Sequence, residues 1–283
     1  MRYIVIIPAY NEEIFLEQLL ESLVSQTLLP LRAVVVDDNS TDNTFGTAAA
    51  FAEQYPFITV LRNNSEAVHL PGSKVVRAFQ KGFESLDADY DIIVKLDADL
   101  ILPKDYFEKV AAVFSSDESI GMAGGFAYIE RNGEWVLENL TDKDHIRGAF
   151  KAYRKECFEQ IGGLKPAMGW DTVDELLAKF HGWKVVTIPE LKVKHLKPTG
   201  ANYNKAARYK QGEAFYALGY GFVITAIASA KLAMMKKKPA LFLDYMNGYL
   251  RAKNRKAEML VTEEQAKFIR KYRLAKMKEK LFG

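Results

Sequence analysis

The stretch that decides the fold is YIVIIPAYNEE at residues 3–13, where a β-branched apolar run ends in a polar loop. Three more short apolar runs follow along the chain, at residues 32–38, 57–63 and 90–97. Continuous runs of this length are typical of strands that are covered on both faces of a parallel sheet. Between them, apolar residues three and four positions apart predict helices at about 12–26, 43–55 and 73–86. This alternation predicts an α/β fold with right-handed crossovers and a parallel sheet.

After residue 100 the alternation of strands and helices becomes less regular. We expect a helix at about 103–115, then strands at 120–129 and 134–140. Further helices are predicted near 146–160 and 171–181, and two short strands at 184–189 and 191–196. From residue 203 onward the pattern is helical. The sequence therefore predicts a body over residues 1–200 and a helical extension over 201–283.

The composition is that of a globular protein of 283 residues, with 49% apolar and 27% charged residues. This balance excludes intrinsic disorder and small disulfide-bonded scaffolds. Cys157 is the one cysteine, so it cannot form an intramolecular disulfide, and we expect a small buried side chain. No apolar run reaches the roughly 18 residues of a spanning helix, and the N-terminus turns polar too early for a signal peptide. We expect a cytoplasmic protein.

Charge is distributed unevenly along the chain. The net charge is +3, but residues 231–283 contain fifteen Lys and Arg against five Asp and Glu. Residues 1–230 contain twenty-four against thirty-one. A basic tail on an acidic body points to a polyanionic partner, either nucleic acid or an anionic membrane surface.

Acidic and polar side chains follow the predicted strands at the ends where a parallel sheet binds its ligands. The strongest group is Asp97-Ala98-Asp99, which closes an apolar strand. Because alternate residues of a strand point the same way, both carboxylates can face one site. Two hard oxygen donors suit Mg²⁺ or Mn²⁺. The alternative is a pair of capping residues before the next helix.

Four ordered motifs carry a family resemblance. IPAYNEE at 7–13, VVVDDNSTDNT at 34–44 and VKLDADLILP at 94–103 resemble inverting family 2 glycosyltransferases with the GT-A fold. The segment IGGLKPAMGWDTVDELLAKFHGWKV at 161–185 resembles the acceptor-side region of that family. The resemblance covers residues 1–200 and implies a Rossmann-like, mostly parallel central sheet flanked by helices. It further implies a nucleotide-sugar half at about 1–100 and an acceptor half at about 101–200.

The resemblance assigns the loop after the first strand to the nucleoside. It implies that this loop contacts the nucleoside through Pro8, Ala9, Tyr10 and Glu12. Asp38 matches the aspartate that hydrogen-bonds the base in that family, whereas a helix-capping turn is the structural alternative.

The resemblance assigns the diphosphate and its metal to three further positions. Asp97 and Asp99 match the D-x-D motif, with Asp99 the more direct metal ligand and Asp97 nearer the ribose or sugar. Lys74, near a predicted helix start, can neutralise the diphosphate, as can Arg77. Solvated surface cations are the alternative for both, because Gln80 stands where the family has Asn.

The catalytic base is expected at the start of the helix predicted at 171–181. Counting back from Gly182, Trp170-Asp171 falls where the family usually has Glu-Asp, so Asp171 is the first candidate. Asp174, one turn later, is the alternative. A further alternative is that Asp171 only caps the N-terminus of this helix.

His195 is the expected further metal ligand. GT-A enzymes often recruit a late histidine, and a neutral imidazole suits Mn²⁺. A lone histidine with only a structural role is the alternative.

These assignments imply metal-dependent transfer of a sugar to an acceptor hydroxyl with inversion, with Mn²⁺ or Mg²⁺ as cofactor. The donor is a nucleotide sugar, with UDP-sugars favoured over GDP-mannose. The acceptor is a glycan or lipid-linked molecule for cell-envelope polysaccharide or glycolipid. The alternatives are a nucleotide-sugar-binding protein with weak or no turnover and, less favoured, a HAD-like phosphatase. A dinucleotide-dependent oxidoreductase is disfavoured because PAYNEE stands where G-x-G-x-x-G belongs.

The basic tail has its own expected role. Residues 219–235 are apolar apart from Lys231, and Lys236-Lys237-Lys238 follow at once. Helices of this kind lie in the interface of an anionic membrane, so we expect peripheral binding to the inner face of the cell membrane and no nucleic acid. The alternative is that the helices pack on the body and only expose a solvated basic face.

Overall fold

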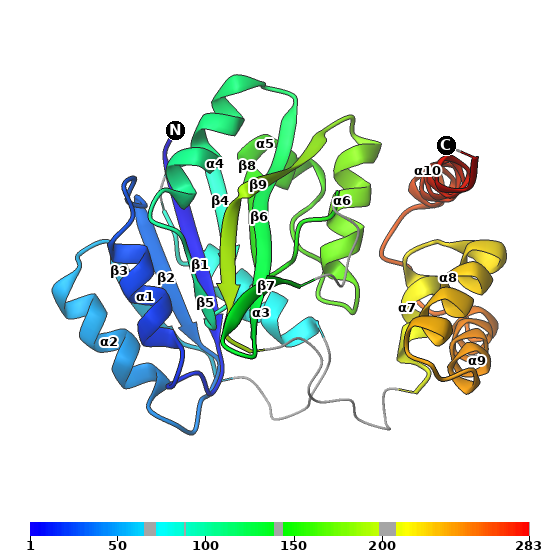
Figure 1. Ribbon diagram of the computed structural model, residues 1–283, viewed down its shortest axis with the longest axis horizontal. Coiled ribbons are helices and arrows are strands. Elements are labelled where there is room, and N and C mark those ends of the chain that lie inside the picture. The colour runs from blue at the N-terminus through cyan, green and yellow to red at the C-terminus, as the bar shows by residue number, and fades with distance from the viewer. Residues whose placement is uncertain (65–71, 88, 139–143, 198–207, 283) are drawn as a thin grey trace.

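The computed structural model describes residues 1–64, 72–87, 89–138, 144–197 and 208–282. Its first half is a parallel sheet made of β1 (Tyr3–Ala9), β2 (Arg32–Asp37), β3 (Ile58–Arg62) and β4 (Ile92–Leu96), in the order β3-β2-β1-β4. The connections are α1 (Leu16–Val24), α2 (Thr44–Gln54) and α3 (Ser73–Glu84). β1 is buried along its whole length, as expected for a central strand covered by helices on both faces (Figure 1).

The second half extends the same sheet with mixed pairing. It contains β5 (Leu100–Ile101), α4 (Tyr106–Ser116), β6 (Ile120–Arg131), β7 (Glu134–Leu137), β8 (Phe150–Arg154), α5 (Lys155–Gln160), α6 (Trp170–Phe180) and β9 (Lys184–His195). Beyond β4 the order is β8-β6-β9-β5, and β7 pairs with β6. β8 is antiparallel to both β4 and β6, whereas β9 is parallel to β6. The sheet is therefore parallel in its first four strands and mixed beyond them.

Two expectations for the second half need correction. The helix predicted near 146–160 is wrong over residues 150–154, which form strand β8 in the middle of the sheet. A lysine at position 151 does not fit the pattern of a central strand, so the sequence does not predict one here. In the structure, the Lys151 side chain is fully buried and is paired with acids from α6. The two strands predicted at 184–189 and 191–196 are one strand, β9. Pro189 divided them in the sequence, and in the structure it lies where the β6–β9 pairing shifts register.

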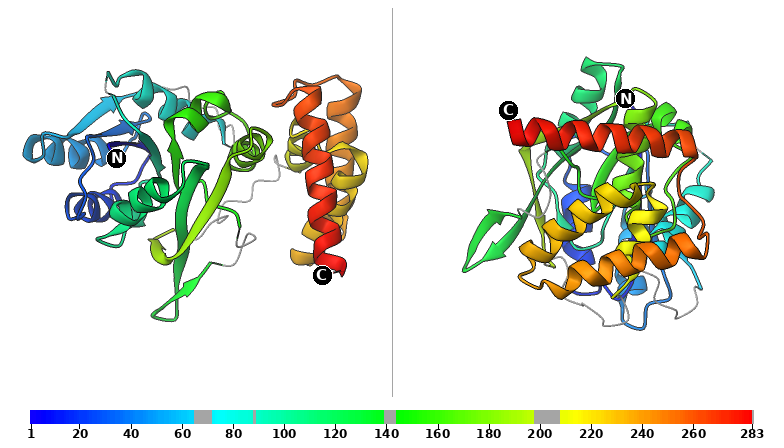
Figure 2. Two further views of the ribbon diagram at one scale, coloured as in Figure 1. Left: turned by 90° about the horizontal axis from the view of Figure 1, so that it is seen from above. Right: turned by 90° about the vertical axis from the view of Figure 1, so that its right-hand side faces the viewer.

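The chain ends in the helices α7 (Lys210–Ala217), α8 (Gly221–Met235), α9 (Ala240–Asn254) and α10 (Glu263–Phe282). They form a separate layer beyond α6, at the end of the molecule opposite β3 (Figure 1, Figure 2). α7 and α9 cross so closely that a Cβ on Gly212 would overlap the carbonyl oxygen of Tyr245. α10 contacts α6, where the rings of Phe180 and Phe268 meet edge to face at 5.5 Å. The border expected near residue 200 lies outside the described residues.

Among the described residues, no helix combines the length and the apolarity needed to cross a bilayer.

Candidate functional site

The loops after β1 and β2 are tied together at the carboxyl edge of the sheet. Asn11 adopts a left-handed backbone (φ 54°), its N–H donates to Ser40 Oγ at 3.0 Å, and its Oδ1 accepts from the Thr41 N–H at 2.8 Å. The Glu12 N–H donates to Thr44 Oγ1 at 2.8 Å. Pro8 and Ala9 are buried, whereas the Tyr10 side chain is 52% exposed. The expected nucleoside loop is therefore a preformed structure with one exposed ring.

Asp38 lies beside that loop and is almost wholly buried. Its N–H donates to the carbonyl of Ala9 at 2.8 Å, and its Oδ1 accepts from Asn63 Nδ2 at 2.7 Å. Asp38 is thus fixed between the end of β1 and the end of β3, and its bonds are not those of a helix N-cap.

Glu12 joins the β1 loop to the acidic end of β4. Both of its carboxylate oxygens accept from Lys197 Nζ at 2.6 Å. Burial raises the pKa of Glu12, and the nearby Asp99 and Asp97 raise it further, although Lys197 opposes them. Glu12 and both aspartates of the D-x-D motif therefore share one electrostatic environment, and Lys197 is its neutralising cation.

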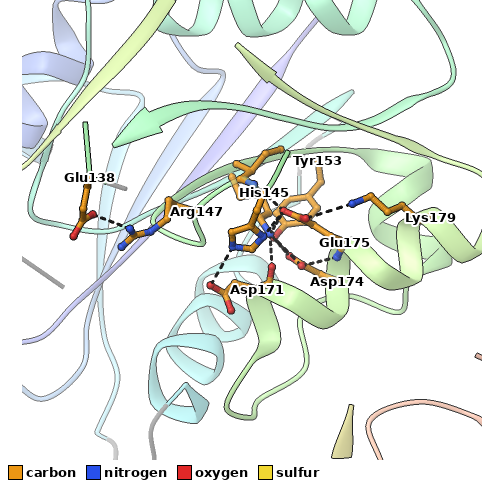
Figure 3. A network of polar contacts seen from close by, with 10 residues as sticks. Glu138, His145, Arg147, Tyr153, Asp171, Asp174, Glu175 and Lys179 are labelled. Carbon is orange, nitrogen blue, oxygen red and sulfur yellow. Dashed lines mark hydrogen bonds and ion pairs between the residues drawn. The ribbon is translucent and has the colours of Figure 1, made fainter. Parts of the chain in front are cut away.

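Asp99 and His195 face each other where β5 pairs with the end of β9. Asp99 Oδ2 lies 3.4 Å from His195 Nε2, and His195 Nδ1 lies 3.4 Å from Glu138 Oε2. Burial opposes a charge on His195, but Asp99, Asp97 and Glu138 outweigh it and raise the pKa of the imidazole. Arg147 holds Glu138 in turn, at 2.7 Å (Figure 3).

These groups suit a divalent metal only in part. An aspartate oxygen and an imidazole nitrogen converge, and the second imidazole nitrogen faces a carboxylate, as is usual behind a metal-binding histidine. Asp97, however, is paired with Lys95. In the described part of the chain, no three His, Cys, Asp or Glu side chains are arranged to hold a metal ion. Asp99 and His195 thus bring one carboxylate oxygen and one imidazole nitrogen together.

Lys95 connects the D-x-D segment to α6. It is buried in β4 next to the Asp97 carboxylate, and its Nζ lies 5.2 Å from the centroid of the Trp170 ring. Directly opposite in register on β8 is Lys151, which is also buried. Residues opposite each other in neighbouring strands share one face of the sheet. Two buried ammonium groups therefore lie on the face that meets the first turn of α6.

Lys151 organises the acidic start of α6, where Asp171, Asp174 and Glu175 lie close together (Figure 3). Its Nζ donates to the backbone carbonyl of Asp171 at 2.7 Å and to both oxygens of Asp174 at 3.1 Å. Glu175 Oε1 lies 3.2 Å from the same nitrogen, and the Tyr153 hydroxyl donates to Asp174 at 2.6 Å. Asp174 is thus enclosed by hydrogen bonds within the protein.

The three acids in the first turns of α6 differ in how deeply they are buried and in their charged neighbours. Burial raises the pKa of Asp174, with Lys151 opposing it. Burial favours a raised pKa for Glu175 too, but Lys151 and His145 outweigh this effect and lower the pKa to about 2. The Asp171 side chain is 36% exposed and lies 3.9 Å from His145 Nε2, while His145 Nδ1 is 3.1 Å from Glu175. Of the two predicted base candidates, Asp171 alone is open to an incoming molecule.

Lys74 lies at the start of α3, with its Nζ 5.6 Å from the centroid of the Tyr10 ring. The structure therefore brings this cation next to the exposed ring of the expected nucleoside loop.

The first part of the site lies within a match to a known family. Residues 4–165 match the sequence profile of Glycosyl transferase family 2. The chain belongs to this family. The match spans the β1 loop, the D-x-D segment and β8, and it removes the HAD-like phosphatase from the candidate functions.

Individual members of the family are similar to this chain over only part of their own length. Dolichol-phosphate mannosyltransferase of Pyrococcus furiosus is 30% identical over 209 residues, which are 67% of this chain and 56% of that protein. Undecaprenyl-phosphate 4-deoxy-4-formamido-L-arabinose transferase of Serratia proteamaculans is 33% identical over 142 residues, 48% of this chain and 40% of that protein. The chain spans about half the length of the curated relatives it matches.

Solved structures confirm the GT-A fold expected for the family. The mannosyltransferase PcManGT of Pyrobaculum calidifontis, in complex with GDP-Man and Mn²⁺, superposes with a TM-score of 0.58 at 19% identity, covering 89% of this chain and 75% of that one. S. aureus TarS 1–349 with UDP-GlcNAc gives a TM-score of 0.59 at 19% identity, covering 81% and 67%.

The buried acids of this family 2 glycosyltransferase predict a stability effect. Lys151→Met leaves Asp174 and Glu175 without their shared cation, and breaking a buried ion pair costs about 3–5 kcal/mol. We expect urea unfolding to show a loss of that size in the free energy of unfolding.

Lys179→Met is the matched control. Lys179 lies 3.7 Å from the same Glu175 but at the partly exposed rim of α6, and such pairs are worth about 0–1 kcal/mol. Equal losses in the two variants would show that Lys151 is not the cation that stabilises this cluster.

Proposed function

We propose that this protein transfers a sugar from a nucleotide-sugar donor to an acceptor hydroxyl, with inversion at the anomeric carbon. The observation that supports it is the position of Lys95 between Asp97 and the Trp170 ring. Because Trp170 directly precedes Asp171, a donor bound at the D-x-D segment would lie next to the proposed base. In this proposal residues 1–200 carry the reaction, and residues 201–283 are an extension.

The donor would be held by the loops at the carboxyl edge. Pro8, Ala9 and Tyr10 would contact the nucleoside, and Asp38 would accept a hydrogen bond from the base. Lys74 would neutralise the diphosphate, since an ammonium near a helix start reaches phosphate oxygens. Glu12 accepts hydrogen bonds from Lys197, so in this proposal it also fixes the loop and that lysine, besides contacting the nucleoside.

A divalent ion, Mn²⁺ or Mg²⁺, would be held by Asp99 and His195, with Asp97 facing the ribose or sugar. When bound, it would act as a Lewis acid that neutralises the leaving diphosphate. The carboxylate–imidazole pair and the Glu138 carboxylate behind His195 support this assignment.

Asp171 is the proposed general base. It would remove the proton of the acceptor hydroxyl as that oxygen attacks the anomeric carbon from the side opposite the diphosphate. The bond from Lys151 to its backbone carbonyl holds the first turn of α6, so the carboxylate is presented from a rigid element. Trp170, most of which is buried, would form the wall under the sugar.

The acceptor is proposed to be a glycan or a lipid-linked molecule. Two relatives are named for transfer to polyprenyl phosphates, dolichol phosphate and undecaprenyl phosphate.

A screen of nucleotide sugars with and without Mn²⁺ tests the proposal. A ligand that binds only the native state at about 100 times its Kd adds about 2.7 kcal/mol of stability. For a chain of this size we expect the Tm to rise by about 5 °C with one UDP- or GDP-sugar, and only when Mn²⁺ is present.

The free sugar and the metal alone are the controls, and neither should change the Tm. If every nucleotide sugar leaves the Tm unchanged, the proposal fails. Binding without any Mn²⁺-dependent hydrolysis of the donor would favour a nucleotide-sugar-binding protein instead.

A further inference from the structure

Helix α8 is apolar on all sides, yet half of it is open. Its sequence GFVITAIASAKLAMM contains one charged residue, Lys231. Ile224, Thr225, Ser229 and Ala233 are buried among the neighbouring helices. A helix that is apolar all round is normally buried all round. The open side of α8 therefore lacks the cover that its sequence calls for.

That open side is a continuous stripe. Val223, Ile227 and Met234 recur at helical spacing and are 61%, 45% and 77% exposed, and Phe222 and Met235 flank them at 56% and 57%. We call these five residues the α8 face. Scattered apolar side chains on a surface are ordinary, but a contiguous stripe marks a surface that binds something.

The charged residues along α8 and just after it have one sign. Lys231 lies on the same side of the helix, and the exposed residues Lys236, Lys237 and Lys238 follow the last turn. No acidic residue occurs between Glu213 and Asp244, and Asp244 is buried and paired with Arg208 at 2.7 Å. An apolar helix face whose own charged residues, and those that follow it, are all lysines is complementary to a surface that is apolar inside and anionic outside.

The other long basic helix does not share this property. The apolar side of α10 packs against the rest of the protein: Ala266 and Ile269 are fully buried, and the Phe268 ring contacts Phe180 of α6. Several of its cations are also paired, such as Arg270 with Glu263 at 3.1 Å. α9 exposes Leu243 at 63% and Leu250 at 39%, so among these helices α8, with five exposed apolar side chains, has the larger open apolar face.

We propose that the α8 face docks on an anionic phospholipid surface. The five apolar side chains enter the interface between headgroups and acyl chains, and the lysines at 231 and 236–238 bind the lipid phosphates. In this proposal the helix lies in the plane of the membrane, as interfacial helices with an apolar face and flanking cations do. This inference rests on the C-terminal helices alone, so it holds or fails independently of the transfer reaction.

Co-sedimentation of the full chain with vesicles tests the inference. We expect wild type to pellet with vesicles of phosphatidylcholine and phosphatidylglycerol but not with phosphatidylcholine alone. Each lysine near an anionic surface gives about a five-fold gain in affinity, so Lys231→Glu with Lys238→Glu should weaken binding by about thirty-fold or more. Val223→Ser with Ile227→Ser and Met234→Ser should abolish pelleting, and because these positions are exposed, the Tm should stay close to wild type.

Lys271→Glu with Lys278→Glu is the matched control. Both lysines are exposed on α10, so this variant has the same net charge as the α8 double variant. It should bind within a few-fold of wild type. Equal losses in the two charge variants, or equal pelleting of wild type with both vesicle types, would overturn the proposal. A wild type that is dimeric in solution and becomes monomeric in the serine variant would also overturn it, because the α8 face would then be a contact between two copies.

Discussion

Asp99→Asn is expected to abolish sugar transfer while the protein stays folded. The substitution keeps the shape of the side chain but removes the carboxylate that faces His195 Nε2 at 3.4 Å. A metal at a leaving group is worth several kcal/mol of transition-state stabilisation, so the rate should fall by about a thousandfold or more. The Mn²⁺-dependent rise in Tm with donor should disappear as well, which gives a measurement independent of turnover.

Asp105→Asn is the matched control for that variant. Asp105 directly precedes α4, and its carboxylate is exposed and paired with Lys109 at 2.6 Å. It should transfer sugar like wild type. If Asp99→Asn keeps its Mn²⁺-dependent donor binding, the metal is held elsewhere and the role of His195 must be reassigned too.

The first half of the fold was predictable because its strands are decided locally. β1, β2 and β4 are buried on both faces, so each appears in the sequence as an apolar run with a polar stop. β8 was not predictable in this way. Its Lys151 is stabilised by Asp174 and Glu175, which lie more than twenty positions away in the chain. A pattern of neighbouring residues cannot predict a partner at that distance.

The same distinction applies to the site. Asp97 and Asp99 follow β4 and His195 is the last residue of β9, and a position at the edge of a sheet can be inferred from strand order. The cations that accompany them were missed as site residues, because Lys95, Lys151 and Lys197 depend on register and on long-range contacts. One signal was available: a lysine inside an otherwise apolar strand, as in IIVKL, requires a buried anion nearby.

The cations also explain how so many acids can gather in one region. Lys197 pairs with Glu12, Lys95 with Asp97, and Lys151 with Asp174 and Glu175. Without these lysines, the carboxylates would repel each other and take up protons. Asp99 and Asp171 each face a histidine, at 3.4 Å and 3.9 Å, and these are the two residues to which the proposed chemistry assigns a metal and a proton.

Asp171→Asn is expected to lower the turnover rate by about a hundredfold to ten-thousandfold, the usual cost of losing a general base. Donor binding should stay at the wild-type level, because Asp171 lies in the first turn of α6 and not in the loops proposed to bind the donor. The Tm should also change little, since the side chain is 36% exposed and the bond from Lys151 goes to its backbone carbonyl. Transfer rates at saturating donor, together with the Tm shift on donor binding, separate these effects.

Asp174→Asn and Asp144→Asn distinguish the base from its neighbours. Asp174 accepts from both Lys151 and Tyr153 inside the protein, so its amide variant should lose stability, and any loss of rate should follow the loss of folded protein. Asp144 is exposed next to His145 and should tolerate the change. If Asp174→Asn instead keeps its Tm and loses its turnover, while Asp171→Asn remains active, the base is the buried acid. The acceptor would then have to reach it by displacing the first turn of α6.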